Sequence, residues 1–460
     1  VQWNWFPDAD VNSNPDNPII NTRSFGEDPK LVGEMATAYI AGAREYGMMT
    51  TAKHFPGHGD TESDSHIFVP VVKGDAARLD AVELPPFRAA IQAGVDAVMV
   101  GHVLVPALDS NPNHVATISP AIVTGLLQEK MGFHGLVITD ALDMRALRQS
   151  FSQEGPDADG RAAVESVKAG NDVLLLPFDL AGAYNGLLRA VRSGEIPESR
   201  IDQSVLKILR AKASVGLNKA KLVDINAVTQ IVAKPASLDV AQEIADSAIT
   251  LVRDNHRTLP LKVTAKGTNS LPNSYQPLAE TRNQTVLLIF TDDSRSESGR
   301  TLDHDLRSRI PDARVYYIDP RDAAGMTQPV LSAVQESQVV IAAVFEFPVP
   351  GKVVRAQDGA AVNAIAVQES SATLLQQVLQ NAPEKTVVVA LGSPYIATQL
   401  PQVQTYICTF SSGHASELSA VKAMFGEIPM TGHLPVTIPN IAARGTGLTV
   451  TAQDSSGGPQ

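Results

Sequence analysis

The chain has 460 residues, of which 44% are hydrophobic and 19% are charged, a composition typical of a globular protein with more than one core. Its formal net charge of −12 argues against a surface that binds nucleic acid or anionic lipid. The single cysteine, Cys408, excludes an internal disulfide and a cysteine-rich metal site. The most apolar stretch, residues 95–108, is interrupted by Asp96 and His102 and is too short for a membrane span.

Short apolar runs alternate with amphipathic stretches over about the first 215 residues. The expected strands are residues 1–6, 48–55, 96–102, 136–140 and 172–177. The expected helices between them include residues 29–45, 84–93, 122–130 and 160–169. Strands that alternate with helices indicate α/β architecture with a parallel sheet.

Polar side chains follow the carboxyl ends of the expected strands, namely Asp8, Asp10, Lys53, His54, His102 and Asp140. In a (β/α)8 barrel these strand ends form the mouth of the active site. Such a barrel needs eight strands, and only about five are visible. We therefore expect a barrel that is incomplete at its N-terminus, with the remaining strands and any signal peptide preceding residue 1.

A second alternating region follows a connector at residues 218–283, which carries helical signals at 240–250 and a polar stretch at 264–277. Its expected strands are residues 285–290, 315–318, 339–345, 386–391 and 405–410. These runs suit strands that are buried on both faces of an open sheet. No GxGxxG motif follows them, so a dinucleotide site is unsupported. We expect a partial barrel at 1–217, an αβα-sandwich at 284–450 and a disordered tail at 451–460.

Residues 53–66 read KHFPGHGDTESDSH and concentrate three histidines in a turn-forming stretch. Asp64 and His66 lie two residues apart, so in extended backbone their side chains point to the same side. A carboxylate on one imidazole nitrogen fixes the tautomer and leaves the other nitrogen to exchange a proton. The alternative interpretation is a solvated polar loop.

Two further signals are weaker when each is taken alone. Asp140 ends the apolar run LVITD, where a carboxylate can act as a nucleophile at an anomeric carbon or can cap a helix. Arg23 lies in the loop NTRSFG, where an arginine can clamp hydroxyls or can form a surface ion pair. The residues alone leave both alternatives open at each position.

Taken together, three motifs resemble glycoside hydrolase family 3, in its NagZ-type β-N-acetylglucosaminidase branch. They are DVNSNPDNPIINTRSFGEDP at 10–29, KHFPGHG with DSH at 53–66, and VITDALDM at 137–144. The similarity extends over nearly the whole chain, because residues 216–440 resemble the αβα-sandwich of that family.

The resemblance implies a role for each matching residue. Asp140 corresponds to the catalytic nucleophile, His66 to a histidine acid/base, and Asp64 to its dyad partner. Arg23, Lys53 and His54 correspond to sugar-binding positions. His58 lies inside the motif and is expected either to support the loop or to contact the sugar. No metal and no cofactor is implied.

The implied reaction is a double displacement in which Asp140 attacks C1 while His66 protonates the leaving oxygen, so that configuration is retained. The expected substrate carries terminal β-linked N-acetylglucosamine, as in peptidoglycan fragments or chitin-type oligosaccharides. A neutral imidazole repels an anionic acceptor less than a glutamate does, which suggests that phosphate can replace water.

Several alternatives remain. A family 3 β-glucosidase uses a glutamate as acid/base, so the DSH sequence argues against it. A metal-dependent barrel hydrolase would have ligands among His54, His58, His66, Asp60, Asp64 and Asp140. A carbohydrate-binding protein without turnover is a third alternative, and a serine hydrolase is disfavoured because no GxSxG motif occurs.

The expected partner is therefore a carbohydrate, with no nucleic acid and no membrane-spanning segment. The oligomeric state and the compartment, cytoplasmic or exported, are left open by the sequence.

Overall fold

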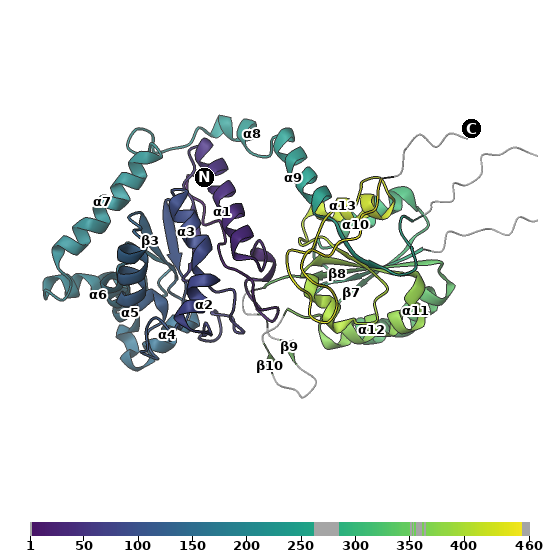
Figure 1. Ribbon diagram of the computed structural model, residues 1–460, viewed down its shortest axis with the longest axis horizontal. Helices are drawn as coiled ribbons and strands as arrows, with labels where there is room; N and C mark the ends of the chain where they lie inside the picture. Colours follow the sequence, from purple (N-terminus) through teal and green to yellow (C-terminus); the bar gives the residue numbers. More distant parts are fainter. Residues whose placement is uncertain are drawn as a thin grey trace, which may run out of the picture. The chain divides into compact units, whose positions relative to one another are not determined.

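The computed structural model describes residues 2–261, 285–349, 352, 354–355, 361–362 and 365–452. They form two compact units (Figure 1): unit 1 comprises Val1–Ile225 with Pro348–Val353, and unit 2 comprises Asn226–Phe347 with Val354–Gln460. Among the described residues, no helix has both the length and the apolar character needed to cross a bilayer.

Unit 1 is built on a parallel sheet in which the strand order follows the chain order. The strands are β1 (Thr51–Phe55), β2 (Ala97–Val100), β3 (Leu136–Ala141) and β4 (Val173–Leu175). The helices are α1 (Pro29–Glu45), α2 (Ala76–Ala81), α3 (Leu84–Gln92), α4 (Arg145–Ser150), α5 (Ala158–Ala169), α6 (Leu180–Arg192) and α7 (Glu198–Ser214). This alternation is that of part of a (β/α)8 barrel, as the sequence predicts.

Unit 1 also contains four helical segments of 3-10 or π type. They are η1 (Asn21–Arg23), η2 (Ala116–Ile118), η4 (Ser152–Asp157) and the π-helical η3 (Ala121–Lys130). Segment η3 occupies the place of the α-helix expected at residues 122–130. Its last turn closes on a hydrogen bond from the Met131 N–H to the Leu126 carbonyl, five residues earlier.

The strand expected at residues 1–6 is not a regular strand in the structure. Trp3 and Asp8 instead pair singly with Met49 and Lys53, on the neighbouring segment that ends in β1. Pro7 lies between the two pairs and has no N–H to donate, which interrupts a regular ladder. The segment still runs beside β1, because the Ala9 N–H donates to the Lys53 carbonyl (2.6 Å).

Unit 2 is an open six-stranded sheet with the order β5-β12-β11-β8-β6-β7, parallel except for β5 at one edge. Its strands are β5 (Thr250–Asp254), β6 (Thr285–Phe290), β7 (Arg314–Ile318), β8 (Val339–Glu346), β11 (Thr386–Gly392) and β12 (Thr405–Cys408). A two-stranded hairpin adds β9 (Val354–Arg355) and β10 (Ala361–Val362). The five strands expected in this region are all present.

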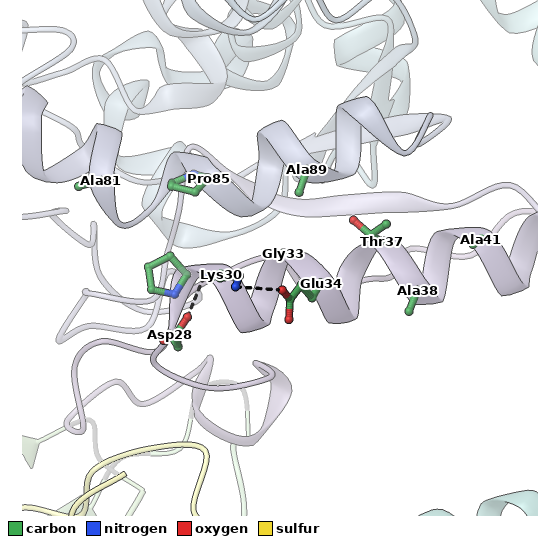
Figure 2. A pocket seen from close by; sticks show the side chains of 11 residues that line it. Asp28, Lys30, Gly33, Glu34, Thr37, Ala38, Ala41, Ala81, Pro85 and Ala89 are labelled. Carbon is green, nitrogen blue, oxygen red and sulfur yellow. Dashed lines mark hydrogen bonds and ion pairs between the residues drawn. The ribbon is translucent and has the colours of Figure 1, made fainter. Parts of the chain in front are cut away.

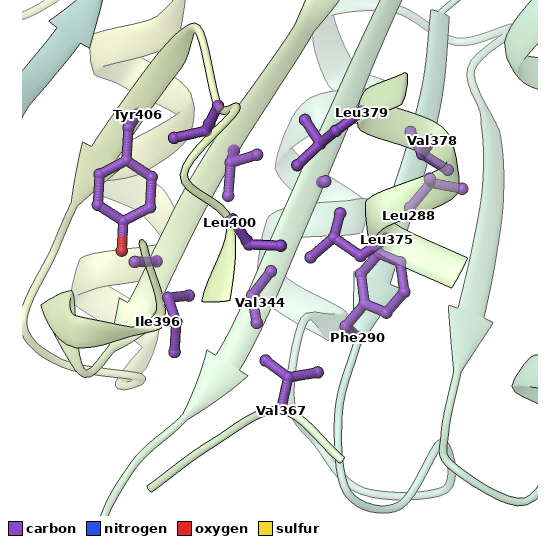
Figure 3. Packing of buried hydrophobic residues seen from close by; sticks show 14 of the residues in the cluster. Leu288, Phe290, Val344, Val367, Leu375, Val378, Leu379, Ile396, Leu400 and Tyr406 are labelled. Atoms are coloured by element: carbon purple, nitrogen blue, oxygen red, sulfur yellow. The ribbon is translucent and has the colours of Figure 1, made fainter. Parts of the chain in front are cut away.

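Helices cover both faces of the unit 2 sheet (Figure 1). They are α10 (Arg300–Arg309), α11 (Ala323–Glu336), α12 (Glu369–Asn381) and α13 (His414–Met424). The chain also forms α8 (Val228–Ile231), α9 (Pro235–Ala248), η5 (Ile225–Ala227), η6 (Pro383–Lys385) and η7 (Pro394–Gln399). Alternate residues of β6 enter different cores: Leu288 and Phe290 pack with α11 and α12 (Figure 3), whereas Leu287 and Ile289 pack with α10 and α13. This period of two explains the uninterrupted apolar run of β6.

Strand β5 and helix α9 both lie within residues 218–283, where the sequence predicts a connector. The polar stretch at 264–277 and the tail at 453–460 lie outside the described residues. The domain boundaries therefore stay predictions, to which the structure adds that β5 is an edge strand of the unit 2 sheet.

Candidate active site

Asp140 lies near the carboxyl end of β3, and its side chain is 19% exposed. One oxygen, Oδ1, accepts the Ala141 N–H (2.8 Å), and the other, Oδ2, lies 4.0 Å from Nε2 of His54. Burial raises the pKa of Asp140, but the neighbouring His54 and His102 rings, the Ala141 N–H and the Lys53 charge outweigh this effect and lower the pKa overall. The carboxylate is therefore held in its ionised form, as a nucleophile requires.

Asp64 and His66 form a hydrogen-bonded pair. The imidazole Nδ1–H of His66 donates to Asp64 Oδ1 (2.6 Å), and the same oxygen accepts the His66 backbone N–H (2.8 Å). Asp64 is buried, whereas the His66 side chain is 38% exposed. The hydrogen bond to Asp64 raises the pKa of His66 despite partial burial, and the Asp64 and Asp140 charges add to this effect. The arrangement fixes Nδ1 on the carboxylate and leaves Nε2 to exchange a proton.

His54 is a buried neutral imidazole whose tautomer follows from its partners. An Arg23 Nη2–H lies 3.3 Å from its Nε2, and a guanidinium can only donate, so Nε2 accepts. Nδ1 therefore carries the proton and donates to Asp10 Oδ2 (2.8 Å). Burial lowers the pKa of His54 to about 3, with the Arg23 charge acting in the same direction. His54 thus presents an acceptor towards Arg23 and Asp140.

Lys53, which precedes His54 on β1, is half-buried beside the same groups. Burial lowers its pKa, and the charges of Asp8 and Asp140 oppose this effect. The sugar-binding residues predicted from the sequence, Arg23, Lys53 and His54, therefore lie in one charged cluster with Asp140.

Asp10 connects the N-terminal segment to this cluster, which the sequence did not predict. Its Oδ2 accepts from His54, while Oδ1 accepts the His58 backbone N–H (2.6 Å). The only sequence signal for Asp10 was its position after an expected strand.

His58 makes hydrogen bonds within the loop, and its ring lies edge-on to that of His54. Its Nδ1 lies 2.7 Å from the Thr61 hydroxyl, and its Nε2 lies 3.3 Å from the Ser65 hydroxyl. Burial lowers its pKa to about 4, which keeps the ring neutral. Because Ser65 lies between Asp64 and His66, His58 joins the KHFPGHG turn to the loop that carries this pair.

His102 follows β2 and holds the backbone of the residue next to Asp140. Its Nε2–H donates to the Ala141 carbonyl (2.9 Å), and its Nδ1 lies 2.6 Å from the Thr117 hydroxyl. Burial lowers its pKa, so the ring is neutral, with its one proton on the nitrogen that faces the carbonyl.

Two glycines explain the close packing of the loop. A Cβ on Gly59 would lie 1.8 Å from the Val11 carbonyl oxygen, and a Cβ on Gly57 would lie 2.7 Å from the Glu83 side chain. Gly57 also has a positive φ of 129°, which side-chain-bearing residues rarely adopt. The turn can therefore pack this closely only with glycine at positions 57 and 59.

The ligand set of the metallohydrolase alternative does not assemble. Within the described residues, the group of potential ligands that converges is Asp8, Asp10 and His54, whose candidate atoms lie within 4.8 Å of one another. Arg23 already places its guanidinium against Asp8 and His54, so a cation would compete with it there.

A separate groove of about 750 Å³ lies on the outside of unit 1 (Figure 2). It is lined by α1 and residues near and on α3: Asp28, Pro29, Lys30, Gly33, Glu34, Thr37, Ala38, Ala41, Ala81, Pro85 and Ala89. None of the predicted site residues lines it, so it does not bear on the chemistry of the polar cluster.

Comparisons with known proteins agree with the resemblance. Residues 1–211 match the glycosyl hydrolase family 3 N terminal domain, and residues 249–456 match the family's C-terminal domain. The chain is 27% identical over 95% of its length to a β-N-acetylglucosaminidase/β-glucosidase of Cellulomonas fimi, of which it spans 74%. It is 31% identical over 58% of its length to β-hexosaminidase A of Pseudoalteromonas piscicida, of which it spans 46%.

A solved structure supports the same assignment. The family 3 β-N-acetylglucosaminidase of Paenibacillus sp. str. FPU-7 superposes with a TM-score of 0.78 at 28% identity, covering 95% of this chain and 76% of that one. The two domain models together cover both halves of the chain in the predicted order, and the superposition covers 95% of it. The chain therefore belongs to glycoside hydrolase family 3.

Proposed function

We propose that the chain removes terminal β-linked N-acetylglucosamine from oligosaccharides with retention of configuration. The observation that carries this proposal is the Asp64–His66 pair beside the ionised Asp140. Together they supply a proton donor and a nucleophile, the two groups that a retaining glycosidase needs. The names of the Cellulomonas fimi and Paenibacillus relatives support the choice of sugar.

The pKa directions match the two roles. The pKa of Asp140 is lowered, so it is an anion that can attack C1. The pKa of His66 is raised, so it keeps its proton for the leaving oxygen and takes one from water in the second step. Arg23, Lys53 and His54 bind the terminal sugar in this proposal.

Aryl glycosides separate this activity from the second candidate, which is β-glucosidase. The name of the Cellulomonas fimi relative includes both activities, so both substrates belong in one experiment. We expect aryl β-N-acetylglucosaminide to be turned over faster than aryl β-glucoside. Faster turnover of the glucoside would reject the proposed specificity.

Four variants test the roles. Asp140→Asn and His66→Ala should each lose turnover, by about 10²-fold or more for the acid/base. Asp143→Asn and His134→Ala make the same chemical changes at exposed positions of unit 1 and should behave like the wild type. Undiminished activity of His66→Ala would remove the dyad from the mechanism.

The acceptor and the natural substrate form the finer part of the proposal. A neutral imidazole in the second step carries no negative charge to repel phosphate, so phosphorolysis competes with hydrolysis. Adding phosphate should raise the rate and yield the sugar 1-phosphate. An unchanged rate and unchanged products would restrict the reaction to water. Comparison of chitin oligosaccharides with peptidoglycan fragments then identifies the natural substrate class.

A further inference from the structure

Asp8 is a buried carboxylate beside the sugar-binding cluster, and packing alone does not explain it. Its side chain has no exposed surface. Oδ1 accepts the Asp10 backbone N–H (3.3 Å), while Oδ2 accepts no hydrogen bond within the part of the chain that the structure describes. A buried acceptor without a donor costs free energy, so the position needs a compensating role.

Two cations of the predicted sugar-binding set face this carboxylate. Nη2 of Arg23 lies 3.6 Å from Asp8 Oδ2 and also 3.3 Å from His54 Nε2. For Lys53, the Asp8 charge is the strongest influence that opposes the effect of burial on its pKa. Asp8 also pairs with Lys53 along the neighbouring segment, so its charge acts on both cations, as an ion pair with Arg23 and as a neighbour of Lys53.

The Arg23 guanidinium is held from several sides. Its Nη1–H donates to the Ile19 carbonyl (3.0 Å), and its Nη2 lies between His54 and Asp8. Without the Asp8 charge, the remaining contacts leave Nη2 with a single neutral acceptor. A planar guanidinium binds with its fixed fork, so a change in its orientation weakens every contact that it makes.

We propose that Asp8 is a positioning residue of the sugar-binding end, which orients Arg23 and Lys53 towards the terminal sugar. The proposal deepens the proposed function and rests on it. Because Asp8 Oδ2 has no exposed surface, Asp8 acts through the two cations and not by contact with the sugar.

The charge of Asp8 changes near neutral pH. The groups that face it are Asp10 on its own segment, Arg23 on η1, and Lys53 and His54 on β1. Burial raises the pKa of Asp8 to about 7 and Asp10 adds to this effect, whereas Arg23 and His54 oppose it. Asp8 therefore gains its proton as the pH falls through about 7, and below this pH its electrostatic attraction to the two cations weakens.

The test compares the wild type with Asp8→Asn, which keeps the shape and removes the charge. Asp202→Asn, at an exposed position of α7, is the matched control. We expect KM to rise about tenfold in Asp8→Asn while kcat stays within about threefold, because the change affects orientation of the binding groups and not the reacting atoms. In the wild type KM should rise from pH 8 to pH 6, whereas in Asp8→Asn it should be high and nearly constant.

Thermal unfolding separates positioning from a structural role. Asp8→Asn should unfold at a higher temperature than the wild type at pH 8, because it removes a buried charge, and this difference should shrink at pH 5, where Asp8 is protonated. A variant that loses stability at both pH values and keeps the wild-type KM would overturn the proposal.

Failure of the proposed function has a different signature. A wild type that turns over only the glucoside contradicts the proposed sugar, and the Asp8 comparison is then made on the glucoside. An Asp8→Asn variant with wild-type KM on the substrate that is turned over contradicts the role of Asp8 alone.

Discussion

At the scale of single residues, the site separates two carboxylates by their surroundings. Asp140 faces histidines and a lysine, and its pKa is lowered. Asp8 is buried beside the carboxyl group of Asp10, and its pKa is raised. The same side chain thus serves as an anion in one place and as a group that titrates near neutrality in the other. Asp64 serves a third purpose, because it raises the pKa of a neighbouring imidazole.

The role of Asp64 leads to a pH prediction. Asp64→Asn removes the acceptor charge that raises the pKa of His66, so this pKa should fall. In the proposed mechanism activity needs a protonated His66, so the alkaline limb of the pH profile follows this pKa. We expect the alkaline limb of kcat/KM to move to lower pH in Asp64→Asn, as measured with an aryl glycoside between pH 4 and 9.

Asp202→Asn provides the control for this shift, because it removes a carboxylate from an exposed position. Its pH profile should coincide with that of the wild type. An unchanged alkaline limb in Asp64→Asn would mean that another group sets it.

The residues of the candidate site were largely predictable because each stands in a dense or well-placed motif. Asp140 ends an apolar strand, and Asp64 and His66 share one short loop. The contribution of Asp10 was not predictable, because it depends on backbone N–H groups about 45 residues away, and spacing does not reveal which of them point at the carboxylate.

At the scale of elements, Gly59 fits against the N-terminal segment with no room for a Cβ atom. Gly59→Ala would place a methyl group 1.8 Å from the Val11 carbonyl oxygen, so one of the two backbones must move. We expect this variant to lose about 1–3 kcal/mol of unfolding free energy, or more, and most of its activity. Denaturant unfolding and aryl glycoside turnover measure both effects.

Gly42→Ala is the matched control for this substitution. Gly42 lies in α1, and a Cβ there would meet no atom within 4 Å. Alanine favours the helix by about 0.5–1 kcal/mol, so this variant should be slightly more stable and fully active. Equal losses in the two variants would show that the turn has no special steric requirement.

Strand prediction succeeded where apolar runs are clear and failed at residues 1–6 and 250–254. Strand β6 has the expected bounds because its residues enter cores on both faces. Strand β5 was not predicted, because its first residue continues a helical pattern and its partner β12 lies about 150 residues further along the chain. The irregular pairing of residues 2–9 likewise depends on Pro7 and on a neighbour that the local sequence does not identify.

At the scale of the whole molecule, the two units have separate cores. Clusters around Phe290 and Ile289 belong to unit 2, whereas the cluster around Phe55 belongs to unit 1. Separate cores can unfold in separate transitions. The candidate site, with Asp140, His66 and Arg23, lies in unit 1.

This division predicts two calorimetric transitions that respond to different changes. N-acetylglucosamine should raise the unfolding temperature of unit 1, because binding stabilises the unit that holds the ligand. Glu417→Ala should lower the unfolding temperature of unit 2, because Glu417 accepts hydrogen bonds from the Gly299 and Leu302 N–H groups at the start of α10. Loss of these acceptors costs about 1–3 kcal/mol.

Lys219→Ala, at an exposed position after α7, serves as the control and should leave both unfolding temperatures unchanged. A single transition that responds equally to the sugar and to Glu417→Ala would show that the two units unfold together.

The fixed tautomer of His54 also bears on the choice of inhibitors. Its Nε2 carries no hydrogen, and its single lone pair accepts from Arg23, so a sugar group that takes the place of the Arg23 N–H there must bring a hydrogen of its own. A deoxyfluoro sugar, in which the hydroxyl at that position is replaced by fluorine, keeps the size of the sugar but has nothing to donate. Among a series of such sugars, the weakest binder should therefore identify which carbon of the ring lies against β1.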